Sequence, residues 1–183
     1  MDLLDPQIRV LQHVPRWSII RTIRQQSVAE HSYYVALYAK VIAKYVGLDP
    51  IESATLIWGA LLHDMEEMIT GDIPTPSKRR HLHIYPYRVS ADMNVDFDKN
   101  VDLGPTAKKV LAVADCFEAI MYLKDEEYMG NMTVKHLCLH LKDQLETICN
   151  DLHPELYEFL SIYISDTTRT KLMTEKGWED TDI

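Results

Sequence analysis

Cysteine and glycine are scarce in this chain, and long apolar runs are missing from it. Its 183 residues include three cysteines and six glycines. So few glycines exclude collagen-like and linker-rich chains. Three cysteines without CxxC spacing indicate reduced thiols in a cytoplasmic protein. A membrane-spanning helix needs about 18 consecutive apolar residues, and no stretch of the chain is that long. The first residues, MDLLDPQIRVLQ, lack the apolar core of a signal peptide, so we expect no secretion.

Basic charge is also in short supply, since 19 lysines and arginines face 28 aspartates and glutamates, for a net charge of -9. Such a surface repels a long nucleic acid, and we expect no membrane partner either. A small anionic substrate can still bind to local cations, and basic residues cluster in segments 16–24 and 78–80. For any single member of these clusters, a solvated surface charge is the simpler interpretation.

Helical periodicity and helix-boundary signals run through most of the chain, and no long β-alternating run stands out. The sequence therefore predicts an all-α fold, a single compact helical bundle over residues 1–183, with a tail after about residue 167 that frays in part. Ser27 and Glu30 have the spacing of a capping box, and Asp49-Pro50 is a second helix start. The expected helices span residues 5–13, 27–47, 49–71, 105–129, 133–150 and 154–164.

Four side chains could form a metal site. His63 and Asp64 lie near the end of an apolar helix, His31 lies in the first turn of another, and Asp115 interrupts the apolar run of residues 110–117. A charged group in such surroundings is costly unless it is paired. Two imidazoles with two carboxylates suit Zn, Mn, Co or Fe. The alternative is that these groups are helix caps and buried ion pairs, in which case the chain is a non-catalytic helical interaction module.

Glu67 follows His63 by four residues and Asp64 by three, which places it on the same face of an expected helix. It can therefore face a ligand that His63 and Asp64 hold without being a metal ligand itself. His136 and His140 are also four residues apart, but no HExxH glutamate accompanies them. We interpret these two as surface or packing histidines.

Five short blocks occur in an order that resembles the HD-domain phosphohydrolase superfamily. They are Arg16-Trp17, AEHS at 29–32, LHDMEE at 62–67, TGDIPTPSK at 70–78 and Ala114-Asp115. Within the superfamily the chain is similar to the small 5'-deoxynucleotidases of bacteria, and especially to the phage dATP triphosphohydrolases of the DatZ type. The resemblance covers residues 16–115 and implies an HD-domain helical bundle with metal-dependent hydrolase activity.

The resemblance also implies a role for each matching residue. Four residues correspond to ligands of a divalent metal ion: His31, His63, Asp64 and Asp115. Zn, Co or Mn is expected at this site, with Mg possible beside the phosphates. Glu67 and Asp72 correspond to catalytic carboxylates, one of which would take a proton from the attacking water. Four more residues correspond to substrate-binding positions: Arg16 and Lys78 at the phosphates, Trp17 and Ile19 at the nucleoside.

The reaction that the resemblance implies is hydrolysis of a deoxynucleotide, most specifically of dATP to 2'-deoxyadenosine and triphosphate. In that branch the reaction depletes dATP in a phage whose genome carries 2-aminoadenine. A bulky Ile19 would crowd a purine 2-amino group and so favour adenine. The alternative is a deoxynucleoside 5'-monophosphate phosphatase (5'-nucleotidase) that uses the same site. In either case we expect a small-molecule substrate and a homo-oligomer in the cytoplasm, or in the host cytoplasm if the protein is viral.

Overall fold

The computed structural model describes residues 6–74, 77 and 101–165, which are largely helical. Its elements, in chain order, are η1 (Pro6–His13), α1 (Val28–Tyr45), α2 (Pro50–Leu62), α3 (Glu67–Thr70), α6 (Pro105–Tyr128), η2 (Met132–Val134), α7 (Lys135–Asn150) and α8 (Leu156–Ile164). Within those ranges there is no strand, only an isolated bridge between Pro15 and Ser27, so the all-α prediction is confirmed. None of the described helices is both long and apolar enough to cross a membrane. Lys78 and the tail after residue 167 lie outside the described residues.

Local signals start the helices much as the sequence predicts. Ser27 Oγ accepts a hydrogen bond from the Glu30 N–H at 3.2 Å, and Asp49 caps two amides in the first turn of α2. The predicted capping box is only half formed, because the Glu30 carboxylate accepts instead from Arg24 Nη1 at 2.7 Å. The first expected helix, over residues 5–13, is wound as the 3-10 helix η1.

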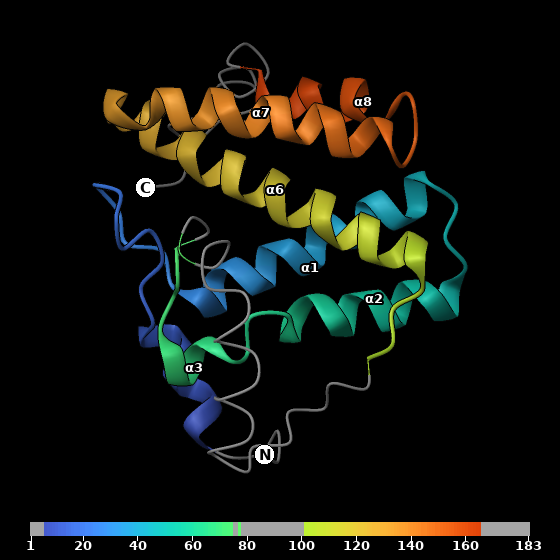
Figure 1. Ribbon diagram of the computed structural model, residues 1–183, viewed down its shortest axis with the longest axis horizontal. Coiled ribbons are helices and arrows are strands. Elements are labelled where there is room, and N and C mark those ends of the chain that lie inside the picture. The colour runs from blue at the N-terminus through green and yellow to red at the C-terminus, as the bar shows by residue number, and fades with distance from the viewer. Residues whose placement is uncertain (1–5, 75–76, 78–100, 166–183) are drawn as a thin grey trace, which may run out of the picture.

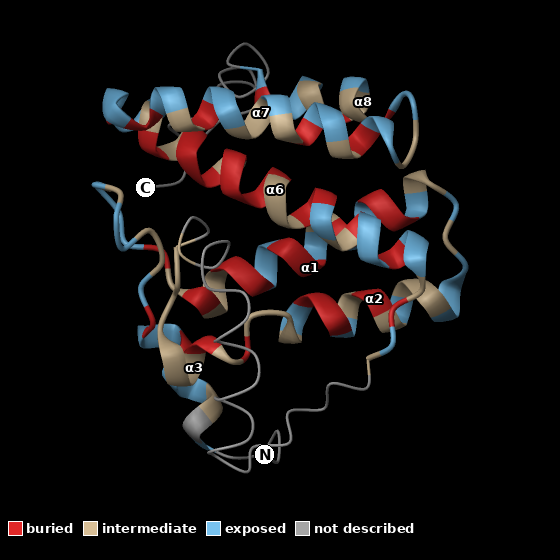
Figure 2. Ribbon diagram, in the orientation of Figure 1, coloured by how far each residue is buried: buried red, intermediate tan, exposed pale blue. Residues whose placement is uncertain are grey.

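The bundle is layered, with α6 between α1 and α7 and with α2 packed on α1 (Figure 1). Buried residues run along α1 and α6 in particular (Figure 2). Val35 and Ile42 of α1 and Val110 and Ile120 of α6 are at most 1% exposed. Burial of such apolar side chains is the main force that holds the two helices together. The packing sets the first turn of α1 beside the middle of α6.

The helix expected over residues 49–71 is interrupted, so that prediction is wrong. α2 ends at Leu62, residues 63–66 form turns, and α3 begins at Glu67. Within this stretch amides bond to carbonyls three residues back, as the Glu67 N–H does to Asp64 O at 3.0 Å. Neither glycine nor proline marks the break, so apolar periodicity alone could not reveal it. The tighter winding occurs directly at the predicted ligand pair.

Candidate metal centre and adjoining pocket

Three predicted ligands converge at one end of α1. His31 comes from the first turn of α1, whereas His63 and Asp64 come from the turn after α2. Their ligand atoms all lie within 4.8 Å of one another. Asp64 Oδ2 is 3.6 Å from His31 Nε2 and 3.3 Å from His63 Nε2. Two imidazoles and a carboxylate form a suitable donor set for a transition metal.

Hydrogen bonds determine which nitrogen of each ring faces this cluster. His63 Nδ1 lies 2.7 Å from the carbonyl oxygen of Ala60, and His31 Nδ1 lies 2.5 Å from Glu118 Oε2. A proton on each Nδ1 makes these bonds and leaves Nε2 as the ligand atom. Both Nε2 atoms are buried, and neither makes a hydrogen bond of good geometry among the described residues, although carboxylate oxygens lie 3.1–3.6 Å away. Since a buried polar atom without a well-formed hydrogen bond is costly, the two rings fit a cation bound at Nε2.

Asp115 brings the fourth predicted ligand to the cluster from the middle of α6. Its Oδ1 lies 3.1 Å from His31 Nε2. Burial would lower the pKa of His31, but the carboxylates of Asp115 and Glu118 outweigh that effect and raise it to about 8. Burial would raise the pKa of Asp115, but contact with His31 outweighs it and lowers the pKa to about 2. The carboxylates of Asp64, Asp115 and Glu118 thus gather negative charge around His31, which favours a bound cation.

The two predicted catalytic carboxylates lie at the two ends of the short helix α3. Glu67 begins α3 and is buried. Gly71, whose φ of 70° lies in the left-handed region, ends the helix and is followed by Asp72. Asp72 Oδ2 accepts a hydrogen bond from the Trp17 N–H at 3.0 Å. The segment from the ligand pair to Asp72 thus joins the metal cluster to the loop that carries Trp17.

The backbone of Trp17 has a φ of 67°, the only positive value among the described non-glycine residues. This region costs an L-amino acid roughly 1–2 kcal/mol. The Trp17 N–H bond to Asp72 holds the conformation, and the indole Nε1–H donates to Gln26 Oε1 at 2.9 Å. The indole also stacks on Tyr122, with ring centroids 5.4 Å apart. Strained residues that their surroundings hold in place are concentrated at functional sites.

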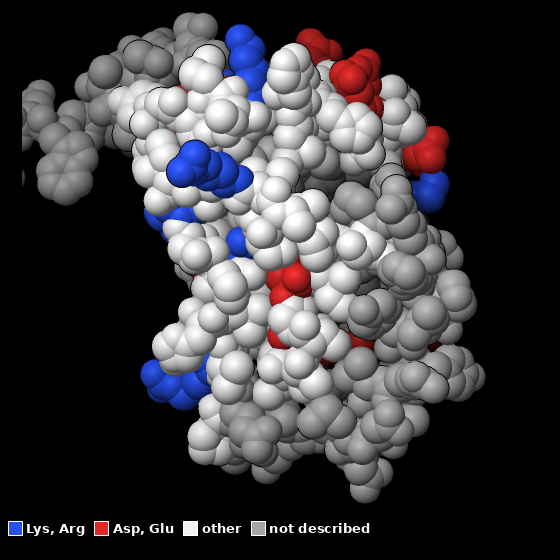
Figure 3. All heavy atoms as spheres, turned by 60° about the vertical axis from the view of Figure 1, so that its left-hand side comes forward, with Lys and Arg blue, Asp and Glu red and all other residues white. Residues whose placement is uncertain are grey.

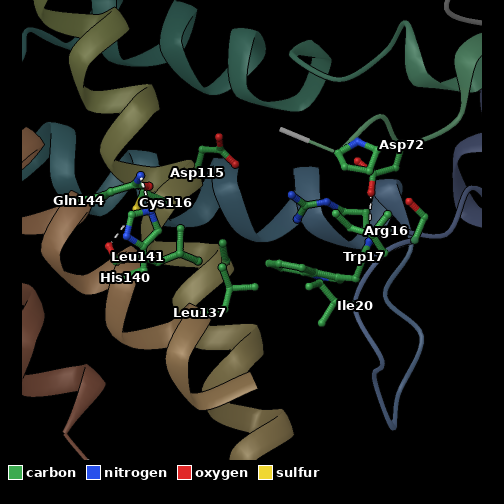
Figure 4. Close-up of a pocket in the computed structure, with 14 residues that line it drawn as sticks. Arg16, Trp17, Ile20, Asp72, Asp115, Cys116, Leu137, His140, Leu141 and Gln144 are labelled. Atoms are coloured by element: carbon green, nitrogen blue, oxygen red, sulfur yellow. Dashed lines mark hydrogen bonds between the residues drawn. The ribbon is translucent and has the colours of Figure 1, made fainter. Parts of the chain in front are cut away.

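A cavity of about 650 Å³ adjoins the cluster (Figure 4). That volume lies within the range of small-molecule sites. Figure 4 shows the Trp17 ring and Leu137 facing each other across it, with Asp115 nearby. The lining residues are Arg16, Trp17, Ser18, Ile19, Ile20, Asp72, Pro74, Asp115, Cys116, Ala119, Leu137, His140, Leu141 and Gln144. The cavity therefore brings three of the four predicted substrate residues together with Asp72 and Asp115, while the fourth, Lys78, is outside the described residues.

Charge of both signs is exposed on one side of the molecule. On the face drawn in Figure 3, a few acidic side chains lie near the centre and others at the upper right, whereas most of the basic side chains lie toward the left and the top. The Arg16 guanidinium, which lines the cavity, lies over the Trp17 ring at 5.4 Å. Carboxylates attract a cation and guanidinium groups bind phosphate, so the site suits an anionic substrate beside a metal ion.

Some residues at the site were missed by the sequence analysis. His140 is exposed, as predicted for a surface histidine, but with Gln144 it also lines the cavity, and their Nε2 atoms are 3.0 Å apart. Their four-residue spacing, which puts both on one face of α7, was the available signal. Glu118 was missed too, although it follows Asp115 by three residues and so shares its face of α6.

Comparison with known proteins places the chain among HD-domain proteins. A family model described as an HD domain matches residues 8–159. A 5'-deoxynucleotidase of Pasteurella multocida is 30% identical over 179 residues, which cover 84% of this chain and 88% of that protein. The dATP triphosphohydrolase of Cyanophage S-2L is 29% identical over 113 residues, which cover 61% of this chain and 65% of that protein. A dATP triphosphohydrolase of Salmonella phage PMBT28 is 45% identical over 85 residues, 43% of this chain and 44% of that protein. The chain thus spans less than two thirds of either phage protein.

Solved structures share the fold. The HD phosphohydrolase DatZ of Cyanophage S-2L, solved with dA and one catalytic Zn2+ ion, superposes with a TM-score of 0.72 at 22% identity, over 93% of this chain and 99% of that chain. The PH0347 protein of Pyrococcus horikoshii superposes with a TM-score of 0.67 at 20% identity, over 89% of this chain and 95% of that chain. With the family match over most of the chain, these likenesses lead to one conclusion: the chain belongs to the HD domain family.

Proposed function

We propose that the protein is a metal-dependent deoxynucleotide phosphohydrolase. The observation that carries the proposal is the convergence of His31, His63, Asp64 and Asp115 at the edge of a cavity of about 650 Å³. The relatives named as 5'-deoxynucleotidases and dATP triphosphohydrolases support deoxynucleotides as the substrate class.

The four converging residues would hold a divalent ion, with Zn, Co or Mn preferred and Mg possible beside the phosphates. When bound, such an ion polarises a phosphoryl oxygen and acidifies a water molecule. Glu67 and Asp72 are the protein's candidates for proton transfer: one takes the proton of the attacking water and can return one to the leaving oxygen. Asp72 is held for this role by the Trp17 N–H.

The positive charge of Arg16 and Lys78 would stabilise the phosphate oxygens as negative charge develops on them. Arg16 lines the cavity, which supports this role. Trp17 and Ile19, from the same segment, would contact the nucleoside. Ile19 is 65% exposed, so its side chain is free to meet a ligand.

The more specific proposal is that dATP is hydrolysed to 2'-deoxyadenosine and triphosphate, which would deplete dATP in a phage with a 2-aminoadenine genome. Two phage dATP triphosphohydrolases among the relatives support it. The second candidate is a deoxynucleoside 5'-monophosphatase. It is favoured by the Pasteurella multocida 5'-deoxynucleotidase, because that match extends over 84% of this chain.

Product analysis separates these candidates. The purified protein is stripped with a chelator, reloaded separately with Zn, Co, Mn or Mg, and given dATP or dAMP. Triphosphate and deoxyadenosine from dATP support the triphosphohydrolase. Release of inorganic phosphate from dAMP, with no product from dATP, supports the monophosphatase. No product from either nucleotide with any metal would contradict both and favour a non-catalytic interaction module.

We also propose that the protein acts in the cytoplasm, or in the host cytoplasm if it is viral, and as a homo-oligomer. No disulfide bond joins Cys116, Cys138 or Cys149 within the described part of the chain, which agrees with a reducing compartment. Exposed apolar side chains after Gly130, such as Leu139 and Ile162, could contribute to a subunit interface. Light scattering after size-exclusion chromatography measures the oligomeric mass, and a monomeric mass at micromolar concentration would contradict this part of the proposal.

A further inference from the structure

Glu118, on α6, is a buried carboxylate with contacts in two directions. It is 3% exposed, and its Oε2 lies 2.5 Å from His31 Nδ1 and 3.3 Å from Arg16 Nη1. Its other oxygen, Oε1, accepts a hydrogen bond from Gln26 Nε2 at 2.6 Å. An ionised carboxylate in such a place is costly unless its oxygens are satisfied. Here three donors satisfy them, two from the segment between η1 and α1 and one from α1.

Toward the metal cluster, Glu118 sets the orientation of a proposed ligand. His31 can rotate about its side-chain bonds and can carry its proton on either nitrogen. The Nδ1 contact with Glu118 fixes both choices and directs Nε2 toward Asp64 and Asp115. A carboxylate behind a metal-binding histidine also makes the imidazole a stronger ligand. His63 differs, because its Nδ1 partner is only a backbone carbonyl, that of Ala60.

Toward the cavity, the same carboxylate fixes a proposed phosphate-binding group. The Arg16 side chain is 14% exposed, and its Nη1 lies 3.3 Å from both Glu118 Oε2 and Gln26 Oε1. Gln26 Oε1 also accepts from the Trp17 indole N–H at 2.9 Å. Glu118 and Gln26 thus form a buried pair behind Arg16 and Trp17, the proposed substrate-binding residues. An arginine held in this way loses less side-chain entropy when it binds an anion.

We propose that Glu118 is a positioning residue that links the metal centre to the Arg16 side of the cavity, because its one carboxylate holds both His31 and Arg16. This inference rests on the proposed metal-dependent function. It assigns Glu118 two separable effects, one on metal affinity through His31 and one on substrate binding through Arg16. Because Glu118 touches the ligand and the arginine rather than the substrate, its effects should appear in binding constants more than in the chemical step.

The test compares three variants with the wild-type chain. Glu118→Gln keeps the size of the side chain but removes its charge. Glu126→Gln is the matched control, since Glu126 is also a fully buried carboxylate of α6 but accepts hydrogen bonds from the backbone amides of Ile23 and Arg24 instead. The double variant Gln26→Glu/Glu118→Gln returns a carboxylate to Arg16 and Trp17 without returning one to His31.

Zn2+ affinity of the metal-free protein is measured by titration calorimetry, and KM and kcat are measured with dATP and dAMP. We expect Glu118→Gln to weaken Zn2+ binding by about 10–100-fold, the usual effect of losing such a partner, and to raise KM more than it lowers kcat at saturating metal. Glu126→Gln should leave the Zn2+ affinity unchanged. The double variant should recover the wild-type KM but not the wild-type Zn2+ affinity.

The outcomes distinguish this inference from the function on which it rests. If wild-type protein binds Zn2+ and Glu118→Gln binds it equally well with an unchanged KM, the role of Glu118 is wrong while the metal site stands. If Glu126→Gln weakens Zn2+ binding as much as Glu118→Gln, the effect is general destabilisation and the inference is overturned. If the wild-type chain itself binds neither Zn2+ nor nucleotide, the proposed function fails, and the inference fails with it.

Discussion

At the scale of single residues, the site concentrates groups that are costly to bury or to hold. Trp17 has a left-handed backbone, and the Nε2 atoms of His31 and His63 are buried without a hydrogen bond of good geometry among the described residues. A fold tolerates such features when the surrounding structure holds them in place. Here each of them borders the cavity or the metal cluster. The residues that cost stability are thus the residues to which we assign function.

The proposed ligands and the proposed base should respond differently to mutation. Asp64→Ala should lose bound metal and activity together, because it removes a ligand that lies between the two histidines. Glu67→Gln should keep the metal and lower kcat by about 10²–10⁴-fold, the usual contribution of a general base. Metal content by mass spectrometry and initial rates on the same samples check both. An Asp64→Ala protein that kept its metal and its rate would refute the ligand assignment.

Ile19 provides a separate test of base preference. The side chain is exposed and lines the cavity, so shortening it should leave the fold intact and open space beside the base. We expect Ile19→Ala to gain activity on dGTP, whose 2-amino group needs that space, while retaining activity on dATP. Relative kcat/KM values for the two nucleotides measure the change. No gain on dGTP would show that Ile19 does not set the preference.

At the scale of elements, α6 supports both the core and the site. Near its C-terminal end it contacts the connector between η1 and α1, residues 14–27, which carries Arg16 and Trp17. Glu126 accepts hydrogen bonds from the Ile23 and Arg24 amides at 2.6 and 2.8 Å, and Tyr122 Oη–H donates to the Arg24 carbonyl. The connector has no regular secondary structure of its own apart from an isolated bridge. Its position therefore depends on these contacts with α6.

Glu126→Gln tests this anchoring through stability and its dependence on pH. Burial would raise the pKa of Glu126, but hydrogen bonds from Asn131 and from the Ile23 and Arg24 amides outweigh it and keep the pKa below its usual 4.5. The ionised group therefore stabilises the fold above pH 4.5, and this contribution is lost as the pH falls through the lowered pKa. We expect the variant to lose about 1–3 kcal/mol at pH 7. Denaturant unfolding should show this loss shrinking in acid, and a constant difference at all pH values would contradict it.

The sequence predicts the positions of the helices well wherever the capping residues and the apolar periodicity indicate the same boundaries. Ser27 and Asp49 cap α1 and α2, and the helices expected over 105–129 and 133–150 are close to α6 and to η2 with α7. The break after Leu62 could not be predicted, because helical and turn backbones share the same apolar spacing there. Glu118 was missed for another reason: its spacing from Asp115 indicates a shared helix face, but its partners are more than 80 residues away in the chain, and only packing brings them together.

At the scale of the whole molecule, the proposed metal centre joins parts of the chain that are far apart in sequence. His31 lies on α1, the His63-Asp64 pair follows α2, and Asp115 lies on α6. A cation bound by all three segments binds only the folded state and must therefore stabilise it. Chelation should lower the stability of the entire bundle rather than of one loop.

Thermal melting measures that linkage. A free metal concentration of about 100 times Kd contributes about 2.7 kcal/mol, which for a chain of this size corresponds to roughly 5–11 °C in Tm. We expect EDTA to lower the Tm by an amount of this order and re-added Zn2+ or Co2+ to restore it. Asp64→Ala is the matched control, since its Tm should not respond to metal. If neither chelator nor added metal changes the Tm of the wild-type protein, the claim that a metal bound by the three segments stabilises the fold is contradicted.

The most direct measurement is anomalous X-ray diffraction at the cobalt absorption edge, from crystals of the chain grown with Co2+. We predict a strong anomalous peak at coordination distance from the Nε2 atoms of His31 and His63 and from the carboxylates of Asp64 and Asp115. A peak elsewhere, or none at this cluster in crystals whose protein is shown to carry cobalt, would contradict the account.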